Sequence, residues 1–141
     1  ALGDASPDGK HFWAAPWEVG TEFGGNGLTP SAPSDLPNPK LSSHNPPIAI
    51  VATDADLTQA QCTRMATAAH DGMARALVPA HTPMDGDLIF GVSTNAKPLD
   101  NDIADTLWLG HAAATCLARA IARGVWHATP KEGDTLPCFR A

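Results

Sequence analysis

The stretch IAIVATDADLTQAQ, residues 48–61, joins a strand pattern directly to the start of a helix. Residues 48–53 form a continuous apolar run rich in β-branched side chains, which is typical of a strand that is buried on both faces. Thr58 and Gln61 match a capping box, in which two side chains satisfy free N–H groups of the first helical turn. The sequence therefore predicts a buried strand followed by a helix that reaches about Leu77.

The predicted helix has one apolar face and one glycine in its interior. Its spacing directs the following residues inward: Leu57, Met65, Ala69, Met73 and Leu77. Gly72 costs a helix about 1 kcal/mol relative to alanine, so its presence indicates close packing or a break.

A second strand and helix follow. The stretch HTPMDGDLIFGVST, residues 81–94, combines a turn shaped by Pro and Gly with an apolar strand at 88–94. A turn at 95–101 and a helix from Asp102 to about Arg123 come next. We expect the following residues of that helix to face inward: Ile103, Leu107, Ala114, Leu117 and Ile121. Residues 48–128 are therefore predicted to be an α/β core.

The first 47 residues are unlike this core. They contain eight of the thirteen prolines and keep neither a strand nor a helix period. The segment from Phe12 to Phe23 is nevertheless rich in aromatic residues, which disordered segments usually lack. We predict an arm at 1–47 that packs against the core, and a loop-like tail at 129–141. Because two strands do not form a stable sheet alone, further strands must come from the arm, a second copy or missing chain.

Composition narrows the class of protein. The chain has 141 residues, a net charge of −6 and no cluster of Lys or Arg, which argues against nucleic acid and anionic membrane as partners. No apolar run approaches the roughly 20 residues that span a bilayer. Three cysteines without metal-type spacing do not indicate a disulfide framework, so a reducing cytoplasm is the expected location.

Asp85 and Asp87 are the candidate chemical groups. Alternate residues of an extended chain share a face, so these carboxylates are expected to point the same way at the start of a strand. Such a pair suits acid/base chemistry or charge orientation, although Asp is also an ordinary turn residue. A weaker alternative is a metal site formed by His81, Asp85 and Asp87. The competing interpretation is that His81 only forms hydrogen bonds within the turn. We expect no metal and no cofactor.

Several stretches resemble the DmpA-type aminopeptidase family, which includes the β-aminopeptidases and the nylon-oligomer hydrolase NylC. The similar stretches in the core are IVATDADLT (50–58), AHDGMARA (69–76) and AHTPMDGD (80–87). In the arm they are FWA (12–14), PWE (16–18) and EFGGNG (22–27). The resemblance covers about residues 11–27 and 46–128.

The resemblance implies a hydrolase that matures by cutting its own backbone before a Ser or Thr. It implies an αββα sandwich, of which this chain is a part, and substrates that are peptides, amides or amino-acid oligomers. The freed residue is the nucleophile, its new α-amino group can act as the base, and Asp85 and Asp87 assist it. The family's oxyanion group lies in an earlier region, so we expect a missing N-terminal portion or a partner subunit. We also expect a homo-oligomer.

Position 46 departs from the family pattern. Counting back from Thr53 places the nucleophile there, after Asn45, but this chain has Pro46. Proline has no hydroxyl, so it can neither attack the preceding carbonyl nor form an ester intermediate. Self-cleavage by the family route is therefore not expected. Two interpretations stay open: a hydrolase of amide or peptide bonds, and an inactive family member or fragment with an interaction role.

Overall fold

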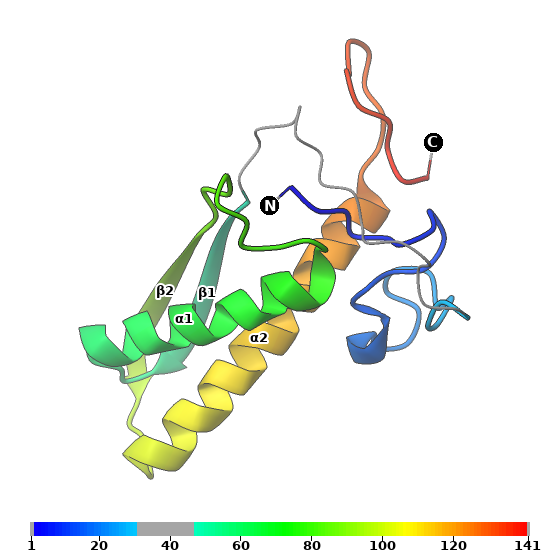
Figure 1. Ribbon diagram of the computed structural model, residues 1–141. Coiled ribbons are helices and arrows are strands. Elements are labelled where there is room, and N and C mark those ends of the chain that lie inside the picture. The colour runs from blue at the N-terminus through cyan, green and yellow to red at the C-terminus, as the bar shows by residue number, and fades with distance from the viewer. Residues whose placement is uncertain (1, 31–46, 141) are drawn as a thin grey trace.

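The computed structural model describes residues 2–30 and 47–140 and shows two helices lying side by side over one face of a small sheet (Figure 1). Its elements are η1 (Ala15–Trp17), β1 (Ile48–Ala55), α1 (Gln59–Ala76), β2 (Leu88–Lys97) and α2 (Asp102–His127). This order confirms the predicted α/β class. Three elements are longer than expected: β1 continues past Thr53 to Ala55, β2 continues into the predicted turn at 95–101, and α2 runs beyond Arg123.

The two strands are parallel. Ile48 pairs with Leu88, and the register continues to Thr53 opposite Ser93 before it shifts at Ala55. A parallel pair needs a crossover, and α1 supplies it. Both strands therefore begin at the same end of the sheet.

The start of α1 confirms the predicted capping box. The Thr58 hydroxyl oxygen accepts from the Gln61 backbone N–H, and Gln61 Oε1 accepts from the Thr58 backbone N–H at 2.9 Å. Two free N–H groups are thereby satisfied where the chain leaves β1. The helix start is thus fixed by local residues.

Small residues bring α1 and α2 together. A Cβ on Gly72 would lie 2.3 Å from the Ala114 carbonyl oxygen, and one on Gly110 would lie 3.0 Å from Ala68 Cβ. Gly72 therefore marks close packing rather than a break. Because the contacts advance in the same direction along both helices, α1 and α2 are parallel.

The described part of the arm, residues 2–30, contacts α2. Phe12 and Phe23 are buried, with ring centroids 5.4 Å apart, and Trp126 at the end of α2 packs against the same cluster. Arg119 of α2 donates to both carboxylate oxygens of Glu22, at 2.6 and 3.0 Å. The described part of the arm is thus held by aromatic packing and by an ion pair.

The prediction of strands buried on both faces is wrong for this chain. Alternate side chains of β1 and β2 are exposed on the face opposite the helices, including Ile50 at 67 % and Phe90 at 53 %. The apolar run is real, but the described residues supply a cover for one face only. The described residues therefore form one two-stranded sheet with one helical layer on one of its faces.

Two inward positions of α2 are also wrong. Ile103 is 83 % exposed and Leu107 is 62 % exposed, whereas Ala114 and Leu117 are buried and Ile121 packs against the core as expected. The helical spacing identified the apolar stripe correctly. Within the described residues, nothing covers Ile103 and Leu107 at the N-terminal end of this stripe.

Candidate functional site

The candidate site lies where both strands begin. The Leu88 backbone N–H donates to the Pro47 carbonyl oxygen at 3.1 Å, and Ile48 pairs with Leu88. Asp87 immediately precedes Leu88 in the chain. The parallel register therefore brings the chain just before β1 beside the acidic turn just before β2.

The turn around Asp85 is closed by two reciprocal hydrogen bonds. The Asp85 backbone N–H donates to the Thr82 carbonyl oxygen at 2.9 Å, and the Thr82 backbone N–H donates to Asp85 Oδ2 at 2.8 Å. Pro83 and Gly86 flank this Asx-type turn, which is the chemistry expected of them. The side chain of Asp85 is thereby fixed relative to the start of β2.

Asp85 is held as a carboxylate. Burial raises the pKa of Asp85, but the contributions that lower it, of which the hydrogen bond from the Thr82 backbone N–H is the largest, outweigh burial and leave this pKa below its ordinary value. Asp85 and Asp87 are both half-buried, and one oxygen of each is shielded from solvent. At neutral pH Asp85 can accept a hydrogen bond or orient a positive group, and it does not donate a proton.

Two of the predicted site residues lie outside the described residues. Asn45 and Pro46 precede Pro47, whose carbonyl oxygen accepts from the Leu88 backbone N–H next to Asp87. The structure thus brings together Asp85, Asp87 and the chain that leads from position 46.

His81 is a hydrogen-bonding residue of the turn. Its Nε2 lies 3.2 Å from the His70 carbonyl oxygen, and the two imidazole rings are 5.2 Å apart. Within residues 2–30 and 47–140, no group of three His, Cys, Asp or Glu side chains is placed to hold a metal ion. The metal-binding alternative built on His81, Asp85 and Asp87 therefore has no support in this part of the chain.

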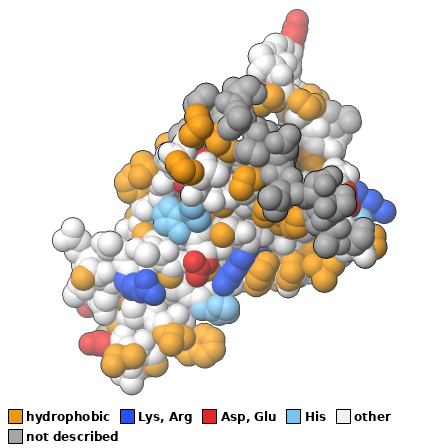
Figure 2. Space-filling model, in the orientation of Figure 1, with side chains coloured by type: hydrophobic (Ala, Val, Ile, Leu, Met, Phe, Trp, Pro, Cys, Tyr) orange, Lys and Arg blue, Asp and Glu red, His pale blue; other side chains and the backbone are white. Residues whose placement is uncertain are grey.

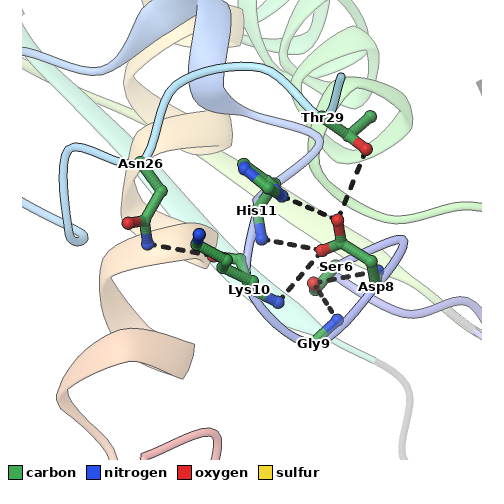
Figure 3. A network of polar contacts seen from close by, with 7 residues as sticks. All are labelled: Ser6, Asp8, Gly9, Lys10, His11, Asn26 and Thr29. Carbon is green, nitrogen blue, oxygen red and sulfur yellow. Dashed lines mark hydrogen bonds and ion pairs between the residues drawn. The ribbon is translucent and has the colours of Figure 1, made fainter. Parts of the chain in front are cut away.

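A carboxylate–imidazole pair in the arm was not predicted from sequence. Asp8 accepts from the ring Nδ1 of His11 at 2.6 Å, and backbone N–H groups of His11 and Lys10 also donate to it (Figure 3). These bonds hold the pKa of Asp8 well below its usual range. Ser6 Oγ accepts from the Gly9 backbone N–H, and among the described residues no hydrogen bond joins Ser6 to His11, so the pair anchors a loop and forms no Ser-His-Asp arrangement.

The Leu2 contact to Asp85 also escaped sequence analysis. Asp4 and Val78 form an isolated antiparallel bridge, which carries the first residues of the arm to the acidic turn. No local pattern predicts a pairing between segments so far apart in the chain. The spacing of Asp8 and His11, by contrast, could have predicted their contact, because an Asp side chain can accept from backbone N–H groups two or three residues later in the chain.

Three comparisons with known proteins bear on this site. The model of peptidase family S58 matches residues 10–136. Proteins of Mycobacterium tuberculosis and Mycobacterium bovis, both named uncharacterized aminopeptidases, are 42 % identical over 106 residues, which is 68 % of this chain and 30 % of theirs. A Mycobacterium leprae protein of the same description is 41 % identical over 108 residues, 70 % of this chain and 30 % of its own.

The chain thus spans about 30 % of the length of these curated relatives. In the described residues, no helix is both long enough and apolar enough to cross a membrane.

Proposed function

This chain belongs to peptidase family S58, and we propose that it forms the acidic-pair part of a hydrolase of amide or peptide bonds. The reaction would be of the aminopeptidase or amino-acid-oligomer amidase type. The observation that carries the proposal is the hydrogen bond from Leu88 to Pro47, which seats the segment after position 46 beside Asp87.

In this proposal Asp85 and Asp87 assist a nucleophile that is not the side chain of Pro46 and that the complete protein supplies near the start of β1. Asp85 is ionised and fixed by its turn, so its carboxylate can hold an attacking hydroxyl or a substrate ammonium group in place. The rigid edge of two paired strands keeps that carboxylate in one position. Positioning of this kind is what an acid pair contributes to nucleophilic catalysis.

The rest of the protein would complete the fold on the exposed sheet face. That face carries Ile48, Ile50, Leu88, Phe90 and Val92, each between 41 % and 69 % exposed. An apolar sheet face of this kind needs a covering layer, and a second sheet is the cover that an αββα sandwich provides. We propose that this second sheet and the oxyanion group come from chain outside the present sequence.

A second candidate function is an inactive family member with an interaction role. One observation favours it: Pro46 occupies the nucleophile position and has no hydroxyl. Neither self-cleavage nor an acyl intermediate can proceed through this side chain. The fold and the acidic turn would then be kept for structure and for assembly.

An activity assay on the complete natural gene product separates the two candidates. The probes are the p-nitroanilides of alanine and β-alanine, which release a coloured amine on hydrolysis. Hydrolase function predicts release that falls at least tenfold in Asp85→Asn and is unchanged in Asp54→Asn. Asp54 is a suitable control because it is a carboxylate on β1 that pairs with Lys97, towards the far end of the sheet. No release by the unchanged protein would overturn the hydrolase proposal and favour the inactive one.

A further inference from the structure

The first residues of the arm lie beside the loop that joins α1 to the acidic turn (Figure 1). In the bridge between Asp4 and Val78, the Asp4 backbone N–H donates to the Val78 carbonyl oxygen at 3.2 Å, and the Val78 backbone N–H donates to the Asp4 carbonyl oxygen at 3.1 Å. Ala5 is buried, and its carbonyl oxygen accepts from the Trp13 backbone N–H at 3.1 Å. This segment is therefore fixed to the loop at Val78 and to the arm at Trp13.

Gly3 sets how closely the two segments approach each other. A Cβ at this position would lie 2.3 Å from the Pro79 carbonyl oxygen and 2.4 Å from the Val78 carbonyl carbon. Both are backbone atoms, which cannot move aside as the end of a flexible side chain can. A residue without a side chain is therefore required where the arm meets the loop.

The bridge carries Leu2 to Asp85. Leu2 is only 4 % exposed, and its backbone N–H donates to the Asp85 carboxylate. Like the Thr82 backbone N–H, this donor favours the charged form of Asp85 and lowers its pKa. Thr82 belongs to the turn itself, whereas Leu2 reaches the carboxylate from a distant part of the chain.

The other side of the loop is held by α1. His81 adopts a positive φ of 57°, and its ring Nε2 lies 3.2 Å from the His70 carbonyl oxygen. Figure 2 shows His side chains gathered over α1 on this face of the molecule. A residue other than glycine keeps such a backbone conformation only where its surroundings impose it. The loop is thus held between α1 and the arm, and the position of Asp85 depends on both.

We propose that residues 2–4 of the arm are a positioning element of the acidic turn, in which the Leu2 backbone N–H holds the Asp85 carboxylate and Gly3 permits the close approach. The consequence for catalysis rests on the proposed hydrolase function, whereas the contact itself does not. A carboxylate aligns a reacting group only as well as it is itself held. Loss of this one donor is therefore expected to slow the reaction although every side chain of the site is kept.

The test replaces Leu2 by leucic acid, the α-hydroxy acid with the same side chain, in the complete natural gene product. An ester oxygen then takes the place of the N–H, and the titratable groups of the adjoining segments stay as they are, namely Asp4, His70, His81 and Asp87. We expect the pKa of Asp85 to rise, because a donor to its charged form is lost. Carbon-13 NMR of labelled aspartate carboxyl groups measures this pKa, and the Asp85 signal is identified by its absence from Asp85→Asn.

Hydrolysis of alanine p-nitroanilide should change together with this pKa. We expect kcat/KM to fall roughly tenfold, which is the usual weight of one hydrogen bond to a charged group. The acid limb of its pH profile should move to higher pH, because Asp85 acts as a carboxylate. The same ester at Leu28, an exposed leucine of the arm, is the matched control and should leave the pKa and the rate unchanged.

Gly3→Ala is the second variant, because its Cβ would push the segment away from Pro79, and it should also raise the pKa of Asp85. An unchanged pKa in either folded variant would overturn the proposal, and so would an equal rise in the Leu28 control. A raised pKa with an unchanged rate in an active protein would overturn it too, because the contact would then not position Asp85 for the reaction. A complete protein that hydrolyses no probe would overturn the proposed function alone, and a raised pKa of Asp85 would still support the contact.

Discussion

Replacement of Glu22 by Gln tests how the arm is attached. Glu22 Oε1 lies 2.6 Å from Arg119 Nε, Oε2 lies 3.0 Å from Nη2, and the Glu22 side chain is only 14 % exposed. The hydrogen bonds from Arg119 come first among the causes that lower the pKa of Glu22 from 4.5 to about 2. At about 1.4 kcal/mol per pKa unit this shift sets an upper limit of roughly 3 kcal/mol. Because solvent screens part of the pair, we expect Glu22→Gln to cost about 1–2 kcal/mol at pH 7.

The effect of Glu22→Gln should depend on pH. A carboxyl group whose pKa is depressed in the folded state stabilises above its unfolded pKa and loses that contribution as the pH falls. The difference between the two proteins should therefore be constant above about pH 5 and should shrink from pH 4.5 towards pH 2. Urea unfolding followed by tryptophan fluorescence measures it, with Glu132→Gln in the exposed tail as control. A difference below about 0.3 kcal/mol at pH 7, or one that persists unchanged at pH 2, would refute the reasoning.

Two further predictions concern the helices and are checked by urea unfolding. Gly72→Ala should destabilise by about 2 kcal/mol or more, since its Cβ would lie 2.3 Å from the Ala114 carbonyl oxygen, whereas Gly124→Ala, with nothing within 4 Å, should stabilise by about 0.5–1 kcal/mol. Equal effects of Gly72→Ala and Gly124→Ala would contradict the close packing of α1 against α2. Thr58→Ala should cost about 1 kcal/mol because it removes the hydroxyl that accepts from Gln61, and no change would contradict the capping role.

Local signals predicted the elements of this fold well. The capping box at Thr58 and the glycine at position 72 each depend on neighbours close in the chain or on one tight contact, and both were confirmed. The end of β2 was harder to predict from the sequence. Asn95 adopts a positive φ of 55°, which resembles a turn residue, yet the strand continues to Lys97.

Burial could not be predicted from periodicity alone. An apolar pattern indicates that a face is to be covered, but it does not say which element covers it. Ile50 of β1 and Leu107 of α2 are apolar yet exposed, because none of the described residues covers them. The acidic turn was recognisable from Asp85 and Gly86, whereas the Leu2 contact depends on a distant pairing that has no local signature.

The central claim is that position 46 is the nucleophile position of an S58 site and that proline there prevents self-cleavage. The intact mass of the complete natural gene product tests it most directly, beside the variant Pro46→Thr. We predict one uncut chain for the natural protein and two fragments, divided between residues 45 and 46, for the variant. Adding Asp85→Asn should slow that division. A natural protein cut between Asn45 and Pro46, or a folded Pro46→Thr variant that stays whole, would contradict the account.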